Sequence, residues 1–181
     1  MNSNRRTLLA AMGGTCLGSA VVGCLGDDGA DYEDIEVADE HFDHLGVETF
    51  ELLDRAYEPP EEMAYMHADH WHGSFHPIPH GDYLSIGAHA ETEDGETIEL
   101  GDEYELHLAV AAGASDGIVS FDHHGDHVHV YGEEEGVTEL VALIVHDDHA
   151  DYQSDRISVQ VSDDAHHDDR EDAHSHDDHD H

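Results

Sequence analysis

The sequence predicts an all-β domain, a β-sandwich of about seven short strands, flanked by an acidic tether and by a tail rich in histidine and aspartate. Three observations predict it. Apolar residues alternate with polar ones in several short runs, which is the period of a half-buried strand. Turn-forming residues separate these runs within about 115 residues. One late run, residues 138–145, is apolar on both faces, as expected of a central strand.

The first half of the domain supplies three of these elements. Residues 49–55 predict either a first strand or a short helix, since the periodicity does not decide between them. Residues 63–72 contain the only tryptophan, Trp71, which we expect in the core with its histidine neighbours turned outward. Residues 81–100 predict a strand, a turn at Glu93-Asp94-Gly95-Glu96 and a second strand.

The second half alternates in the same way. Strands are expected over residues 104–110 and around Val128 and Val130, whose side chains alternate with two histidines. The central run at 138–145 follows, and residues 157–161 alternate as the last strand.

The charge of the chain indicates its working conditions. There are 45 acidic residues, five arginines and no lysine, for a formal net charge of -40. Self-repulsion on that scale opposes a compact state in dilute buffer, but it weakens when the Debye length shrinks to about 3 Å in molar salt. We therefore expect a protein of a high-salt environment, most simply that of a halophilic archaeon. No basic patch is present to neutralise phosphates, so nucleic acid is not an expected partner.

The N-terminus predicts an export signal over residues 1–23. Arg5-Arg6 precede a run of apolar and small residues, and Ser3–Leu9 resembles the twin-arginine export motif. Val21-Val22-Gly23-Cys24 resembles a lipobox, in which Cys24 becomes the lipidated first residue. A membrane-spanning anchor is the alternative, although the run is short and interrupted by glycine. We expect an exported lipoprotein on the outer face of the membrane, whose mature chain has no thiol for a metal.

Two segments flank the expected domain, which spans residues 47–162. Residues 24–46 are acidic, have almost no apolar pattern and predict a solvated tether. Residues 163–181 predict a disordered tail of a kind that binds metals weakly and flexibly. The histidines of this tail are His166, His167, His174, His176, His179 and His181.

The stretch from Asp122 to Gly132 carries the clearest candidate site. His127 and His129 lie at i and i+2 on one face of the expected strand, close enough for both rings to reach one metal ion. Histidine nitrogen is a good zinc ligand. The other interpretation is an exposed strand in a chain that simply contains many histidines.

Further histidines follow the same spacing or lie in loops. The ordered histidines fall in three clusters along the sequence: His67, His70 and His72; His123, His124, His127 and His129; and His146 and His149. The expected metal ligands are His127 and His129 as the primary pair, with one or two sites completed by His70, His72, His146 and His149. Nitrogen and carboxylate ligands suit zinc, copper(II) or nickel. His89 and His107 stand alone on strands and are expected to be structural.

Two resemblances add to this interpretation. Residues 117–145, which include Gly117-Ile118-Val119-Ser120-Phe121-Asp122, resemble the bacterial immunoglobulin-like (Big-type) domains of surface proteins, and residues 81–88 with Asp94-Gly95 look like their second strand and hairpin. This resemblance implies an immunoglobulin-like sandwich over roughly residues 77–162 and no particular chemistry. The histidines at strand ends and in loops depart from that family. The whole layout resembles haloarchaeal twin-arginine lipoproteins, and the tail resembles those of extracytoplasmic zinc-handling proteins.

Three functions follow as hypotheses. The first is a lipid-anchored protein that captures zinc or a similar divalent ion outside the cell and passes it to a metal ABC importer or its binding protein. The second is a surface or adhesion module, which predicts that the histidine clusters lie far apart. The third is a metallohydrolase with Asp126 or Asp147 as general base. No nucleophile motif, phosphate loop or acid–base pair is visible, so we do not expect an enzyme.

Overall fold

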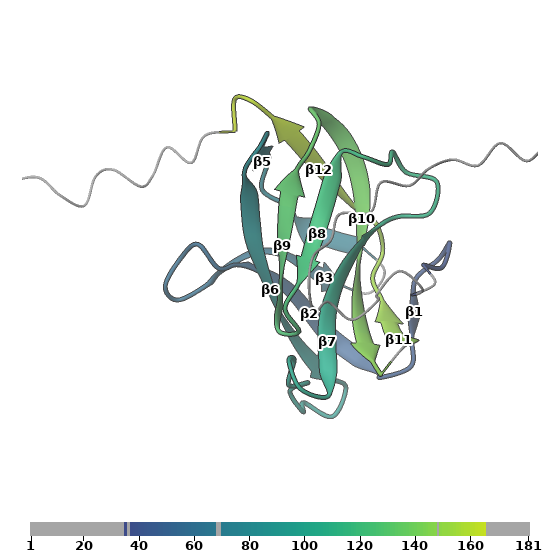
Figure 1. Ribbon diagram of the computed structural model, residues 1–181. Helices are drawn as coiled ribbons and strands as arrows, with labels where there is room; N and C mark the ends of the chain where they lie inside the picture. Colours follow the sequence, from purple (N-terminus) through teal and green to yellow (C-terminus); the bar gives the residue numbers. More distant parts are fainter. Residues whose placement is uncertain (1–34, 36, 68–69, 148, 166–181) are drawn as a thin grey trace, which may run out of the picture. The chain divides into compact units, whose positions relative to one another are not determined.

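The described part of the chain is a β-sandwich of two six-stranded sheets (Figure 1). The computed structural model describes residues 35, 37–67, 70–147 and 149–165. The expected signal, Cys24, most of the tether and the histidines of the tail lie outside the described residues. Among the described residues there is no helix of the length and apolarity needed to cross a membrane.

The twelve strands of the described residues divide equally between the sheets. The first sheet contains β1 (Phe42–Asp43), β11 (His149–Gln153), β10 (Gly136–His146), β12 (Ile157–Ser162) and β5 (Ile78–Pro79) in that order, with β7 (Tyr104–Val110) paired to β10. The second sheet has the order β4 (His70–Gly73), β3 (Glu61–His67), β2 (Val47–Asp54), β6 (Tyr83–Thr92), β9 (His127–Gly132) and β8 (Val119–His123). The number exceeds the seven expected partly because two-residue strands such as β1 and β5 carry no readable period.

Strand β10 is the centre of the first sheet. Its residue Leu143 pairs with His107 of β7 and with Gln153 of β11, so these two strands lie along opposite edges of β10. Every side chain from Leu140 to Val145 is buried. This confirms the expectation that the run apolar on both faces is a central strand.

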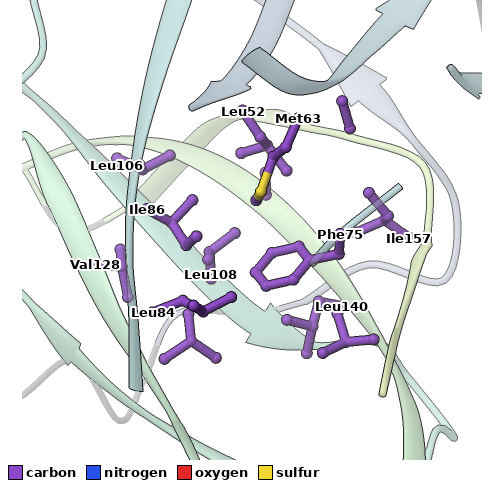
Figure 2. Close-up of a cluster of buried hydrophobic side chains, with 14 of the residues drawn as sticks. Leu52, Met63, Phe75, Leu84, Ile86, Leu106, Leu108, Val128, Leu140 and Ile157 are labelled. Atoms are coloured by element: carbon purple, nitrogen blue, oxygen red, sulfur yellow. The ribbon is translucent and has the colours of Figure 1, made fainter. Parts of the chain in front are cut away.

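The main core lies between the two sheets. Leu52 and Ile86 enter it from the second sheet, and Leu108 and Leu140 enter it from the first; each is at most 1% exposed. Figure 2 shows these side chains meeting with Phe75, which comes from the segment after β4. Burial of an aliphatic side chain of this size contributes about 1.5–3 kcal/mol. Because the apolar residues of each strand lie on one face, this contribution favours packing of the apolar faces of the two sheets against each other.

The outer face of the first sheet is also covered, and this corrects the expected tether. Residues 37–46 belong to the folded domain, since β1 pairs with β11 and Val37 packs on a second apolar cluster. The buried side chain of Gln153 bonds to the amide nitrogen and the carbonyl oxygen of Ala38, at 2.9 and 3.0 Å. The sequence of this segment predicts a solvated tether because the segment has no alternation of apolar residues. Much of it is held instead by hydrogen bonds to the buried side-chain amide of Gln153.

Two other expectations are resolved by the fold. The segment 49–55 forms strand β2, and Trp71 packs against the core while its indole N–H donates to the Asp155 carbonyl over 2.7 Å. The turn at residues 93–96 forms, but the segment after it makes only single bridges, Glu91 with Thr97 and Leu100 with Tyr104. The second strand expected up to residue 100 is therefore wrong.

Candidate metal centre

The β8–β9 hairpin carries the candidate site. Its turn is the pair Gly125-Asp126, and the His124 N–H donates to the His127 carbonyl over 2.9 Å. Gly125 has φ of +80°, a conformation that glycine adopts without strain at the first central position of a two-residue turn. His124 and His127 consequently face each other across the two strands. His129 follows two residues later on the same face of β9.

The three imidazole rings of this hairpin form one compact group. Ring centroids lie 4.6 Å apart for His124 and His127, 4.6 Å for His124 and His129, and 5.2 Å for His127 and His129. One ligand nitrogen from each ring lies within 4.8 Å of the others. We call this group the tri-histidine group.

These separations can be compared with those of a zinc site. Around a tetrahedral zinc with metal–nitrogen bonds of about 2.0–2.1 Å, imidazole centroids are on the order of 5 Å apart. The rings of the tri-histidine group are already at this spacing. His124 and His127 are stacked at 16°, so ligation requires side-chain rotation rather than movement of the backbone.

Two partly exposed carboxylates adjoin the rings of the group. The Nδ1 atom of His127 lies 2.6 Å from Oδ1 of Asp126, and the other carboxylate oxygen of Asp126 accepts a hydrogen bond from Arg55 over 2.9 Å. Asp122 lies 3.2 Å from Nε2 of His124. Carboxylates in this position orient a metal-binding imidazole and raise its basicity.

The surroundings of His129 favour its neutral form. Partial burial lowers the pKa of His129, and the neighbouring rings of His124 and His127 lower it further. Partial burial raises the pKa of Asp126, but its hydrogen bonds and charge interactions with His127 and Arg55 outweigh this effect and leave the pKa below its usual value. Neutral imidazole is the form that binds a metal, and ionised Asp126 is the form that accepts a hydrogen bond from the Nδ1–H of His127.

A second group lies on the β10–β11 hairpin of the other sheet. His146 pairs with His149, and Asp151 lies two residues further along β11. Asp151 has one carboxylate oxygen 3.0 Å from Nε2 of His149 and the other 3.8 Å from Nδ1 of His146. Their three ligand atoms also lie within 4.8 Å of one another, which gives two nitrogens and one oxygen for a metal.

The expected ligands do not converge on one site. The β8–β9 and β10–β11 turns lie on either side of the start of β7, where Leu106 donates to Gly125 and Tyr104 pairs with His146, and they form two separate groups. His70 and His72 lie on β4, the edge strand at the far side of the second sheet from β9. The expectation that they join the other histidines is corrected, since β3, β2 and β6 intervene.

Two potential ligands of these groups are absent from the ligand set that the sequence predicts, namely His124 and Asp151. The sequence analysis places His124 in a cluster only, and it gives Asp151 no role. The available signal was the spacing His-x-x-His at a turn, because residues that flank a two-residue hairpin turn face each other across the strands. The residue two positions further on shares their face.

The remaining strand histidines have structural surroundings. His107 is 2% exposed and stacks on His123 with ring centroids 4.3 Å apart. Burial lowers the pKa of His107, and burial together with the neighbouring His107 lowers the pKa of His123 to about 4. His89 is partly exposed and lies 3.3 Å from Glu91. The structural role expected of His107 agrees with its buried position.

The fold and the two groups define a class, an all-β sandwich with two side-chain groups that could hold a metal ion. No family model matches the chain, and no curated protein matches it. The chemistry of the groups is therefore the basis of the functional argument.

Proposed function

We propose that this protein binds zinc outside the cell and delivers it to a membrane importer. The observation that carries the proposal is the tri-histidine group, three imidazole ligands at the spacing of a zinc site on one hairpin. Three histidines leave a fourth position for water or for a ligand of a partner, which allows the ion to be passed on.

The choice of zinc rests on the ligand set. The tri-histidine group offers three nitrogens, and the second group offers two nitrogens and one carboxylate oxygen. Such ligands suit zinc, copper(II) and nickel, and neither group contains the sulfur that copper(I) prefers. A set of three imidazoles suits zinc, because this ion accepts tetrahedral coordination with one exchangeable ligand.

The cellular setting is part of the same proposal. The twin-arginine and lipobox patterns would place the chain outside the membrane, anchored through Cys24. The partner would be a metal ABC importer or its binding protein. The immunoglobulin-like strand order implied by the resemblance to Big-type domains belongs to this proposal as well.

A surface or adhesion module is the second candidate. It is favoured by the separation of the histidine clusters onto three hairpins, which that hypothesis predicts. It does not account for the close approach of ligand atoms within a group. A hydrolase is less favoured, because Asp126 has a lowered pKa and is bonded to Arg55 and His127, whereas an efficient general base has a pKa near the working pH.

Zinc titration calorimetry on the full chain tests the proposal. The six tail histidines are replaced by asparagine to remove their background, and the buffer contains about 2 M KCl to screen the net charge. We expect stoichiometric zinc binding that loses one equivalent in His124→Ala/His127→Ala/His129→Ala. The exposed His80→Ala serves as the control and should bind as the parent does.

The pH dependence provides a second readout. Histidine must be neutral to bind zinc, so zinc affinity should fall between pH 7.5 and pH 5. An affinity that does not change over this range, or the absence of zinc binding at micromolar concentration, would contradict the proposal.

A further inference from the structure

One six-residue spacing occurs at three hairpins of the domain. It is His-x-Asp-His-x-His or His-x-Asp-His-x-Asp, and it is found at residues 67–72, 124–129 and 146–151. The second and third of these contain the two groups described above. The first, in the β3–β4 hairpin, belongs to neither.

The hairpin explains why the spacing matters. In each case the first two histidines flank two residues and face each other across the strands, as the pairings His67 with His70 and His146 with His149 show. The last residue of the pattern lies two positions further along the same strand and shares their face. The pattern thus places three potential ligands together wherever it spans a two-residue turn.

Spacing alone is not sufficient. His41-Phe42-Asp43-His44 repeats the first four residues, but Phe42 and Asp43 form strand β1 and pair with β11 instead of turning. The Asp43 carboxylate there accepts hydrogen bonds from the amides of Leu45 and Val47. A fourth full copy, at residues 176–181, lies outside the described residues.

We propose that the hairpin with this pattern is a repeated metal-binding unit, and that His67, His70 and His72 form a third zinc site. The inference rests on the proposed function, since it assigns the same chemistry to a further place. It adds one site to the two groups that could hold a metal ion.

The geometry of the third site is close to that of a ligand set. Ring centroids lie 4.7 Å apart for His70 and His72, 5.9 Å for His67 and His72, and 6.2 Å for His67 and His70. Spacings on the order of 5 Å are needed around tetrahedral zinc, so His67 has to move inward by about 1 Å. His67 is exposed on its strand, which leaves its side chain free to rotate through solvent.

The backbone beneath these rings is held in place. Trp71 lies between His70 and His72 and points to the opposite face, where its ring packs edge-on against Phe50 and its N–H bonds to Asp155. His72 stacks on Tyr65 at 5.0 Å. The two histidines of β4 are consequently fixed toward solvent on one face, as are those of β9 in the tri-histidine group.

The position of Trp71 supplies a reporter next to this site. It is the only tryptophan of the chain and is adjacent to two of the three ligands. A bound Cu²⁺ ion at this site lies close enough to quench its fluorescence. We therefore test the full chain, with the six tail histidines replaced by asparagine, by copper(II) quenching and by zinc calorimetry in about 2 M KCl.

The expected result is a saturable quench of Trp71 that excess zinc reverses. His67→Asn/His70→Asn/His72→Asn should abolish the quench and lower the zinc stoichiometry by one. His124→Ala/His127→Ala/His129→Ala should also lower the stoichiometry by one but keep the quench. The single variant His72→Asn, with circular dichroism to confirm its fold, should weaken the quench at least tenfold in copper concentration.

The opposing results separate the two proposals. Zinc binding that depends on the tri-histidine group, with no effect of the His67, His70 and His72 substitutions on quenching or stoichiometry, would overturn the third site and leave the proposed function standing. Absence of zinc binding in the parent chain would overturn both.

Discussion

Asp126 connects the tri-histidine group to the rest of the domain. One carboxylate oxygen faces Nδ1 of His127 at 2.6 Å, and the other accepts a hydrogen bond from Arg55, which follows strand β2. With Nδ1 engaged in this way, Nε2 of His127 is the nitrogen available to a metal. Asp126 would therefore act on a metal bound by the group as a positioning residue, through His127.

Replacement of this carboxylate should weaken zinc binding. Asp126→Asn keeps the size of the side chain but removes the negative charge that orients and polarises His127, so zinc affinity should fall roughly 10- to 100-fold. Competition with a zinc-sensitive dye measures the change. Asp116→Asn, at an exposed acid in another turn, is the matched control. Equal affinities of the two variants would contradict the positioning role.

The stacked pair of buried His107 and partly buried His123 predicts an acid sensitivity of the metal-free protein. Burial lowers both pKa values, that of His123 to about 4, whereas an unfolded histidine titrates near 6.5. Between these values the unfolded chain binds protons that the folded chain does not. Stability should therefore be lost as the pH falls from about 6.5 toward 4.

His123→Gln isolates this effect, since glutamine stays neutral at every pH. Melting temperatures measured without metal in about 2 M KCl should fall more steeply below pH 6.5 for the parent than for the variant. The common titration of the carboxylates cancels in the comparison. Parallel curves for the two proteins would show that this histidine is not kept neutral by the fold.

At the scale of elements, the turn of the β8–β9 hairpin determines the site. Gly125 has a positive φ, and a Cβ atom there would lie 2.9 Å from the Gly101 carbonyl oxygen. Gly95 has nearly the same φ of +76°, but a Cβ atom there would meet nothing within 4 Å. Both glycines therefore adopt a positive φ, but only Gly125 is closely packed against another part of the backbone.

Comparison of Gly125→Ala with Gly95→Ala separates the cost of the positive φ from the cost of the clash with the Gly101 carbonyl. Both substitutions carry the strain of a positive φ, about 1–2 kcal/mol. Gly125→Ala adds a clash with backbone, so its free energy of unfolding should be lower by a further 1 kcal/mol or so, and its zinc affinity should fall. Urea denaturation and zinc competition measure the two effects. Equal losses in both variants would contradict the packing argument.

The alternation of apolar and polar residues predicted the strands that bury side chains in a regular period. The alternation around Val128 and Val130 gave β9, and the doubly apolar run gave β10, because side-chain burial has a period that can be read. The position of His70 and His72 on the same outward face of β4 also follows from the two-residue period of a strand. These features depend on neighbours in sequence.

The features that sequence did not predict depend on distant partners. Strand β1 exists because β11, more than a hundred residues later, offers it an edge, and Gln153 holds Ala38 through a buried amide. The separation of the histidine clusters depends on strand order, which no single run specifies. His124 was predictable in principle from turn geometry, once the turn was placed at Gly125-Asp126.

At the scale of the whole molecule, the net charge of -40 predicts that stability depends on salt concentration. Repulsion among surface carboxylates weakens as the Debye length falls from about 10 Å at 0.1 M salt to about 3 Å at 1 M. The melting temperature should rise steadily from 0.1 to 2 M KCl. Circular dichroism measures the melting temperature at each salt concentration. A melting temperature that does not change over this range would contradict adaptation to high salt.

The most direct test of zinc binding by the tri-histidine group is anomalous diffraction at the zinc absorption edge from crystals of the full chain grown with zinc. The account predicts an anomalous peak about 2.0–2.1 Å from a nitrogen of each of His124, His127 and His129. Zinc peaks found only elsewhere, with this group empty at saturating zinc, would contradict it.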